Sequence, residues 1–246
     1  MPTAIVTGGA RGIGRAIAKA HAVASFDVSV VDLEPGSEPG GKIVSFACDV
    51  ADVDGHAALV AEVADRLGPV HCLVNNAGVT SLTRGDMLDL TPASFDRCVA
   101  VNLRGAFFLT QAVARAMIAA DADGSRSPYR SVVTIGSVNA EILGLNRADY
   151  CITKAGLSMM SKLYAGRLAA ARIHAFEIRP GIVRTDMTAP AREKYERYIA
   201  GDGVPLGRWG EPEDVGTTVA TIARGLLPFS TGEIVNVGGG MHLHRV

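Results

Sequence analysis

Short apolar segments alternate with longer amphipathic segments along the chain. The apolar runs, each bounded by Gly, Pro or Asp, read TAIVT, DVSVVDL, IVSFACDV, HCLVNNAG, SVVTIGS, IHAFEIRPG and GEIVNVGGG. Their continuous apolar pattern predicts strands that are buried on both faces. Between most of them, apolar residues recur at helical spacing, which predicts helices over residues 14–24, 55–67, 95–119, 150–171 and 213–226.

This alternation of strands and helices predicts the fold class. Strands that alternate with helices form a parallel sheet with helices on both faces. We therefore expect a doubly wound α/β fold around a central parallel sheet of about seven strands. The sequence has no internal repeat and no Pro/Ser-rich linker, so we expect a single domain over residues 1–246.

Two segments interrupt the alternation. Residues 33–42 read LEPGSEPGGK, which is too rich in Pro and Gly for a regular helix, so we expect a loop there. Residues 120–130 read ADADGSRSPYR, a composition that is typical of an exposed loop. We interpret this second segment as a surface insertion between a helix and the next strand.

Composition narrows the classes of partner. The chain has 246 residues, of which 48% are hydrophobic, and a net charge of −1. This charge gives no long-range attraction to nucleic acid or to an anionic membrane, which leaves a small molecule or a protein as partner. Cys48, Cys72, Cys98 and Cys151 form no C-x-x-C pair and have no histidine at metal-ligand spacing, so we expect free thiols and no metal. Without a basic leader or a run of about 20 apolar residues, we expect a cytoplasmic protein.

A glycine-rich turn follows the first predicted strand directly. TGGARGIG places Gly8, Gly12 and Gly14 at the spacing G-x-x-x-G-x-G, with a helix expected from Ile13. Such a turn lets the backbone approach a pyrophosphate, whose charge the free N–H groups of a helix N-terminus stabilise. Asp32 ends the second strand at about the distance expected for a carboxylate that binds the adenosine ribose. Together these features predict a dinucleotide site.

Asp32 also bears on which dinucleotide binds. A carboxylate about 4 Å from a 2′-phosphate would cost roughly 4 kcal/mol per pair of unit charges at an effective dielectric constant of 20. NAD is therefore favoured over NADP. Arg11, in the glycine turn, could instead pair with a 2′-phosphate, and this alternative stays open.

Several motifs occur in the order that is typical of one enzyme family. They are TGGARGIG, NNAG at 75–78, VNLRG around Asn102, Ser137, and Tyr150 followed four residues later by Lys154. In this order they resemble the short-chain dehydrogenase/reductase family, over nearly the whole chain. VNLRGAFFLTQ, PLGRWGEPEDV and TGEIVNVGGGM are similar to its 3-oxoacyl-[acyl-carrier-protein] reductase branch. The resemblance implies a Rossmann fold, an oxidoreductase, and a catalytic group formed by Asn102, Ser137, Tyr150 and Lys154.

The resemblance also implies which residues contact the dinucleotide. Asp49 and Val50 are similar to the family's adenine contact, and RPGIVRT resembles the segment that holds the nicotinamide carboxamide. The full expected set is Gly8, Arg11, Gly12, Ile13, Gly14, Asp32, Leu33, Asp49, Val50, Asn76, Ala77, Gly78, Tyr150, Lys154, Pro180, Gly181, Val183 and Thr185. Two departures from the family are the Pro/Gly-rich segment 33–42 and VGGG at 237–240, which lacks an acidic residue before the paired glycines.

The chemistry explains why the family places a lysine near a tyrosine. Oxidation of a secondary alcohol needs a base that takes the hydroxyl proton, and lowering a tyrosine pKa from about 10 to about 7 requires roughly 4 kcal/mol. An ammonium about 5 Å away supplies around 3 kcal/mol at an effective dielectric constant of 20, and an oxidised nicotinamide can supply the rest. By resemblance, Lys154 also binds the nicotinamide ribose, Ser137 contacts the substrate oxygen, and Asn102 kinks its helix and holds a water.

The substrate is expected between the residues after Ser137 and a lid over residues 186–203. Pro190 near the start of this segment and Gly201 near its end predict a short helix between flexible joints. With Asn139 and Met187 as expected contacts, we predict a small polar hydroxylated alcohol or the matching ketone.

Alternative functions and the assembly remain open from the sequence. One alternative is a 3-oxoacyl-thioester reductase that uses NADPH, and another is a dinucleotide-sensing protein without catalysis. By resemblance to the family we expect a homo-oligomer, a tetramer or a dimer, formed through the helices predicted at 95–119 and 150–171.

Overall fold

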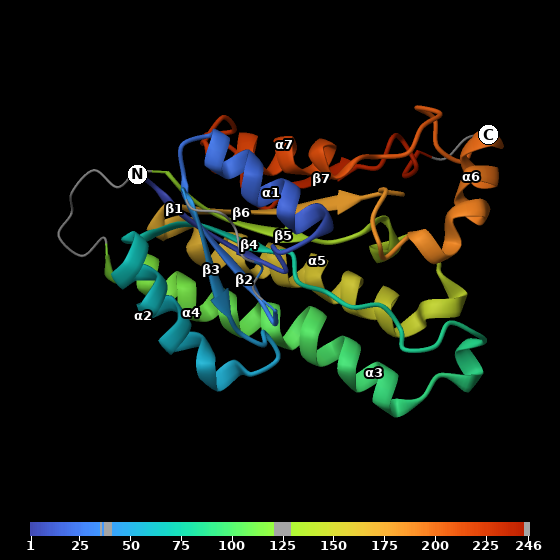
Figure 1. Cartoon of the computed structure of the whole chain (residues 1–246), viewed down its shortest axis with the longest axis horizontal. Coiled ribbons are helices and arrows are strands. Elements are labelled where there is room, and N and C mark those ends of the chain that lie inside the picture. The colour runs from blue at the N-terminus through green and yellow to red at the C-terminus, as the bar shows by residue number, and fades with distance from the viewer. Residues whose placement is uncertain (35, 37–40, 121–128, 244–246) are drawn as a thin grey trace.

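The computed structural model describes residues 1–34, 36, 41–120 and 129–243. Its centre is one parallel sheet of seven strands in the order β3-β2-β1-β4-β5-β6-β7 (Figure 1). The strands are β1 (Thr3–Thr7), β2 (Asp27–Asp32), β3 (Ile43–Ala47), β4 (Val70–Asn75), β5 (Arg130–Ile135), β6 (Ile173–Pro180) and β7 (Ile234–Val237). The predicted parallel sheet and its number of strands are confirmed.

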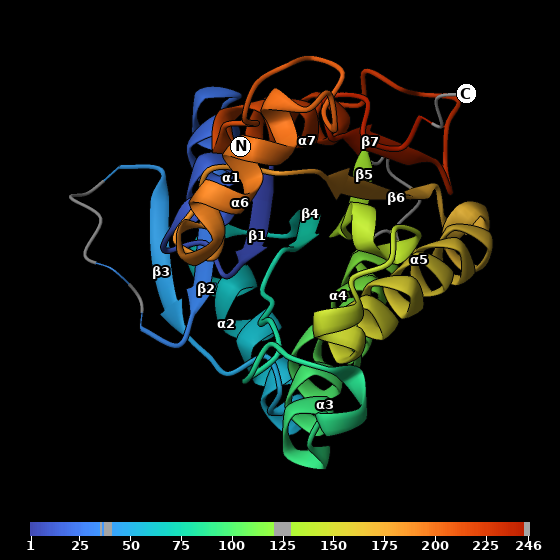
Figure 2. The same cartoon turned by 90° about the vertical axis from the view of Figure 1, so that its right-hand side faces the viewer.

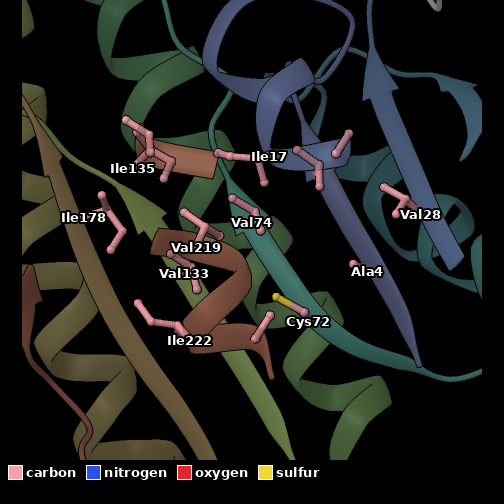
Figure 3. Close-up of a cluster of buried hydrophobic side chains, with 14 of the residues drawn as sticks. Ala4, Ile17, Val28, Cys72, Val74, Val133, Ile135, Ile178, Val219 and Ile222 are labelled. Atoms are coloured by element: carbon pink, nitrogen blue, oxygen red, sulfur yellow. The ribbon is translucent and has the colours of Figure 1, made fainter. Parts of the chain in front are cut away.

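Helices cover both faces of this sheet (Figures 1 and 2). On one face lie α1 (Gly12–Val23) and α7 (Pro212–Ala223), and on the other lie α2 (His56–Leu67), α4 (Ala106–Ala119) and α5 (Ala148–Leu168). The first core packs Ile17 of α1 and Val219 of α7 against strand residues such as Val74 (Figure 3). The second core packs Leu109 and Leu168 on the opposite face. Strands between two apolar layers explain the continuous apolar runs in the sequence.

The predicted helix over 95–119 is not one regular helix. It comprises α3 (Pro92–Cys98), a π-helical segment (Val99–Gly105) and then α4. A side chain at Gly105 would overlap the carbonyl oxygen of Val50, so the chain here packs closely against the segment after β3. This contact between distant segments explains why helical periodicity alone missed the wider turn.

The remaining elements are short. A helix, α6 (Arg192–Ala200), follows a 3-10 turn (Ala189–Ala191), so the helix predicted between Pro190 and Gly201 is confirmed. Other 3-10 turns are Val53–Gly55, Met87–Asp89, Val138–Ala140, Leu145–Arg147 and Ala169–Ala171. The expected loops at 33–42 and 120–130 fall largely on residues 35, 37–40 and 121–128, which lie outside the described residues. Within the described ranges, no helix has both the length and the apolar character needed to cross a bilayer.

Candidate active site

The site is built where the strand order reverses, between β1 and β4. From β1 the sheet grows outward to β2 and β3, and from β4 it grows outward through β5, β6 and β7. At such a reversal the loops after neighbouring strands separate and leave a crevice at the carboxyl ends of the strands. The glycine turn after β1, the NNAG segment after β4 and Ser137 after β5 all lie at this edge.

The glycine turn and the NNAG segment are tied to each other. The side-chain amide of Asn76 donates to the carbonyl oxygens of Thr7 at 2.9 Å and Gly8 at 3.0 Å. The backbone N–H groups of Asn76 and Ala77 both donate to the Thr7 hydroxyl at 3.0 Å. A side chain at Gly8 would stand 2.9 Å from the Cα of Ala77. Asn76 and Ala77 therefore fix the conformation of the glycine turn and also lie against it.

The start of α1 has the features that a pyrophosphate needs. Gly8 and Gly12 have φ values of +61° and +52°, which favour glycine. A side chain at Gly14 would overlap the carbonyl oxygen of Gly8, so the helix starts in direct contact with the turn. Arg11, just before the helix, makes no side-chain cap, and the first turn carries no acidic residue. The backbone N–H groups around Ile13 are thus available to an anion, and these residues fit a dinucleotide.

Asp32 lies at the carboxyl end of β2, next to this turn. Its carboxylate accepts from the backbone N–H of Ala10 at 3.1 Å and from that of Leu33 at 2.9 Å. Leu33 is 67% exposed, and Arg11 is also exposed. The structure therefore fixes the Asp32 carboxylate beside the glycine turn, where a ribose hydroxyl would arrive.

Three other expected cofactor residues are Asp49, Val50 and Thr185. Asp49 accepts from the backbone N–H of Ala51 at 2.9 Å, and Val50 is buried beside it. Thr185 lies next to the glycine turn, because a side chain at Gly12 would stand 3.5 Å from its Cγ2.

The segment after β6 is held in place by backbone bonds. The N–H of Gly181, after Pro180, donates to the carbonyl oxygen of Val237 at 3.0 Å. Val183 is buried, and its carbonyl oxygen accepts from the Thr188 hydroxyl at 2.7 Å. The expected nicotinamide-side segment therefore reaches the glycine turn from the other half of the sheet.

Asn102 sits inside the π-helical segment and is completely buried. Its Oδ1 accepts from the backbone N–H of Val79 at 2.7 Å, and its Nδ2 donates to the Val79 carbonyl at 2.9 Å and to the Thr153 hydroxyl at 3.1 Å. A side chain at Gly78 would stand 3.3 Å from Asn102 Oδ1 and 3.8 Å from Lys154 Nζ. Asn102 therefore joins the NNAG segment to α5 next to Lys154.

Tyr150 and Ser137 are brought together from α5 and the end of β5. Burial raises the pKa of the Tyr150 phenol, while a hydrogen bond with the Ser137 hydroxyl and the positive charge of Arg147 both act to lower it. The net direction is upward, so the pKa depression expected from Lys154 is not found in the protein alone. The Ser137 hydroxyl also accepts from the backbone N–H of Asn139 at 3.1 Å.

Lys154 is buried beneath Tyr150 and does not contact its hydroxyl directly. Its Nζ lies 5.5 Å from the centroid of the Tyr150 ring and donates to the carbonyl oxygen of Ile135 at 2.8 Å. Burial lowers the pKa of Lys154 to about 8, against the opposing effect of the negative charge of Glu177. The amine is therefore poised to change its charge close to neutral pH.

A buried ionic network that the sequence analysis missed lies behind Lys154. Glu177 and Arg179 on β6 are 1% and 4% exposed, and Arg179 Nε donates to Glu177 at 2.8 Å. Ser158 bonds both of them, donating to Glu177 and accepting from Arg179 at 2.6 Å. The Glu177 carboxylate fills the space that a side chain at Gly136 would need. The signal was present in HAFEIRPG, because a charged pair within a buried strand must find partners.

The expected substrate contacts and lid lie at the outer edge of the site. Asn139 is buried, and its amide donates to the Ile142 carbonyl at 2.8 Å, so it shapes the loop after Ser137. Met187 is 44% exposed. On α6, Tyr195 packs edge-to-face on Trp209 at 5.9 Å and lies within electrostatic reach of Tyr150. A direct contact of Asn139 or Met187 with substrate stays a prediction.

The four cysteines, Cys48, Cys72, Cys98 and Cys151, are free, as the sequence predicts. Among residues 1–34, 36, 41–120 and 129–243, no cluster of His, Cys, Asp or Glu could hold a metal ion.

Comparisons with known proteins agree with this arrangement. A family model described as enoyl-(acyl carrier protein) reductase matches residues 8–242. The rat (3R)-3-hydroxyacyl-CoA dehydrogenase is 32% identical, over 98% of this chain and 96% of its own length. The acetoacetyl-CoA reductase of Synechocystis is also 32% identical, over 97% and 95%. The crystal structure of a 3-oxoacyl-[acyl-carrier protein] reductase from Brucella melitensis in complex with NAD is similar with a TM-score of 0.94 and 46% identity, covering 100% of this chain and 98% of that chain.

Proposed function

The chain belongs to the short-chain dehydrogenase/reductase family and interconverts a secondary alcohol and its ketone, and we propose that Tyr150 is the acid/base group of this reaction. One observation carries the proposal. A half-buried tyrosine shares a hydrogen bond with Ser137 and stands over a buried lysine, at the sheet edge that also carries the glycine turn. A phenol in this setting can take a proton from a substrate hydroxyl, or give one to a carbonyl.

The other residues have roles that follow from their contacts. Bound NAD would supply the hydride acceptor and a positive charge next to the phenol. Ser137 shares a hydrogen bond with the Tyr150 hydroxyl, so it can hold the substrate oxygen and stabilise the charge that develops there. Lys154 places an ammonium 5.5 Å from the phenol ring. Asn102 fixes the segment around Lys154 through Val79 and Thr153.

We further propose NAD as the cofactor in preference to NADP. The support is the Asp32 carboxylate, which two backbone N–H groups hold beside the glycine turn. A fixed negative charge there accepts hydrogen bonds from ribose hydroxyls and repels a 2′-phosphate. The similar Brucella melitensis structure contains NAD.

The proposed substrate is a small polar hydroxylated compound. Residues 186–203, which include α6, would form a lid over the site within a single domain of residues 1–246, with Asn139 and Met187 at its edge. The helix α6 reads REKYERYIA and has no buried residue, so the lid would present a mostly polar surface. Tyr195 places a phenol near Tyr150 from this side.

The second candidate function is reduction of a 3-oxoacyl thioester. It is supported by the names of the similar proteins, which act on acyl-carrier-protein or CoA thioesters. Both candidates use the same chemistry at Tyr150 and differ in what the pocket must hold beyond the carbonyl.

A substrate screen with a matched variant tests the proposal. Polyols, hydroxy acids, their ketones and acetoacetyl thioesters are tried with NAD(H) and NADP(H), and turnover is followed at the absorbance band of the reduced nicotinamide. We expect turnover with NAD, and a preference for thioesters would instead support the second candidate. Tyr150→Phe should lower kcat by about 10²- to 10⁴-fold and change NAD affinity by less than about threefold, because only the transferable proton is lost. Substantial activity in this variant would refute the assignment of Tyr150.

We also propose a homo-oligomer, a dimer or a tetramer. The support is a set of exposed apolar side chains on neighbouring helices: Phe108 and Ile118 on α4, and Ile152, Met159 and Leu163 on α5. The four free cysteines fit a reducing compartment such as the cytoplasm.

A further inference from the structure

Arg147 is a cation at the edge of the proposed site, and it has no part in the catalysis proposed above. It ends the 3-10 turn Leu145–Arg147, directly before α5, and its guanidinium carbon lies 5.7 Å from the centroid of the Tyr150 ring. Its backbone N–H donates to the Gly144 carbonyl at 2.9 Å. A side chain at Gly144 would stand 2.9 Å from Arg147 Nε. The loop therefore leaves the space that Arg147 needs to lie against Tyr150.

The guanidinium has no acceptor within the described part of the chain. Its Nε is buried without a hydrogen-bond partner, and none of the ion pairs among the described residues includes it. By contrast, Arg179 contacts two carboxylates, and Arg184 lies 3.2 Å from Glu211. A buried N–H without a partner costs free energy unless an acceptor arrives. Arg147 thus has the property expected of a side chain that pairs with a ligand.

The charge of Arg147 is directed at the reacting end of the site. The positive charge of Arg147 acts to lower the pKa of the Tyr150 phenol, which stabilises the phenolate. Ser137 reaches the same hydroxyl from the end of β5, and Tyr195 of α6 is close enough to influence its pKa. A substrate whose carbinol oxygen meets Tyr150 and Ser137 would lie beside a ring whose centroid is 5.7 Å from the Arg147 guanidinium carbon.

We propose that Arg147 binds a carboxylate of the substrate that lies one or two carbons from the carbinol, so that the enzyme acts on 2- or 3-hydroxy acids or the matching oxo acids. This inference rests on the proposed function. In such acids the carboxylate lies about 2.5–4 Å from the carbinol oxygen, as ordinary bond lengths require. A guanidinium matches the planar geometry of a carboxylate and can donate two parallel hydrogen bonds to it. Arg147 would select the substrate, and Tyr150 would carry out the proton transfer.

Kinetics with charged and neutral versions of one substrate test the inference. The probes are 3-oxobutanoate and its methyl ester, and lactate and methyl lactate, with wild type, Arg147→Gln and Arg147→Lys. We expect the acids to be preferred by wild type, and Arg147→Gln to raise KM for the acids about tenfold or more and for the esters less than about threefold. Arg147→Lys keeps the charge but loses the planar guanidinium, so its KM for the acids should lie between those of wild type and Arg147→Gln.

A matched variant controls for loss of one positive charge. Arg224→Gln removes an exposed cation at the end of α7, on the other face of the sheet, and should leave every KM unchanged. Equal changes for acid and ester in Arg147→Gln would indicate a structural role and overturn the inference. A wild type that oxidises neutral alcohols but rejects all four probes would overturn the carboxylate site and leave the proposed function intact. No turnover of any alcohol or ketone with either cofactor would overturn both.

Discussion

At the scale of single residues, the site contains a buried lysine whose pKa depends on a buried carboxylate. Lys154 is 4% exposed and Glu177 only 1%. Burial lowers the pKa of Lys154 to about 8, and the negative charge of Glu177 acts in the opposite direction. Without that carboxylate, the desolvation cost would favour a neutral amine more strongly. Glu177 is therefore a positioning residue that keeps Lys154 a cation at neutral pH.

This balance predicts the pH dependence of a Glu177→Gln variant. Ketone reduction needs a protonated Lys154, so the rate should fall as pH rises through the pKa of Lys154. Because the variant lacks the group that raises this pKa, its falling limb should move to lower pH. The measurement is kcat for reduction between about pH 6 and 10, a range that spans the lowered pKa and the usual one.

The control for this variant is Glu141→Gln. Glu141 also contacts Arg179, but its carboxylate is 65% exposed, and it is not among the groups that set the pKa of Lys154. The falling limb of the pH profile of Glu141→Gln should stay at the same pH as in wild type. Glu177→Gln leaves Arg179 with one buried partner fewer and should also melt earlier. A lower melting temperature without any shift of the limb would show that Glu177 is structural only.

At the scale of elements, the π-helical segment Val99–Gly105 connects the cofactor side of the site to α5. Asn102 is the connecting residue, because its amide bonds both backbone groups of Val79 and the hydroxyl of Thr153. The wider turn and the absence of a side chain at Gly105 let this segment approach Val50. A distortion of one helix thereby fixes the position of two other segments.

Replacing Asn102 by Ala should destabilise the fold and reduce turnover together. The half-buried N–H and carbonyl of Val79 would lose their partners, at up to about 1–3 kcal/mol for each unsatisfied group. At about 2–4 °C per kcal/mol for a chain of this size, the melting temperature should fall by several degrees. Thermal denaturation and kcat with the same substrate measure both effects. Thr153→Val removes one of the three bonds of Asn102 and should have a clearly smaller effect on both, and an equal effect would contradict this account.

The elements differ in how well the sequence predicts them. α5 and the strands follow from local periodicity, because their apolar residues face cores that lie directly above and below. The π-helical segment does not, since its cause is the contact of Gly105 with Val50, about fifty residues away along the chain. In the site, Tyr150 and Lys154 could be found by their spacing on one helix. The charged pair in the buried strand HAFEIRPG signals that Glu177 needs partners, but which groups it meets, and where Arg147 lies, depend on how strands and loops meet in space.

At the scale of the whole molecule, the reversal of strand order decides where chemistry can occur. The glycine turn after β1 and the segment after β6 come from opposite halves of the sheet, and Thr185 meets the turn near Gly12. The first core lies between α1, α7 and the sheet (Figure 3), and it includes Val183 of the segment after β6. Polar residues at the carboxyl ends of the strands, such as Ser137, belong to neither core and can vary without loss of core packing, which lets one fold serve different substrates.

One surface of the molecule is apolar without being covered by this chain. On α4 and α5, Phe108 and Ile118 are each 38% exposed, Met159 is 57% exposed and Leu163 is 60% exposed. The two helices are neighbours, because the Tyr164 hydroxyl donates to the Phe107 carbonyl at 2.8 Å. Exposed apolar side chains on adjacent helices support the proposed association surface, to which a second copy of the chain would offer the same surface in return.

The final prediction is that substitution on this surface changes assembly before it changes the fold. In Met159→Lys/Leu163→Lys, two large apolar side chains that one chain leaves exposed become charged, so a single subunit loses little core packing. Facing copies would then bring like charges together in a desolvated contact. Light scattering after size exclusion should show an oligomer for wild type and a smaller species for the double variant. Val23→Lys, at a side chain that is 87% exposed on α1, should keep the wild-type mass. A monomeric wild type, or a double variant of unchanged mass, would contradict assembly through α4 and α5.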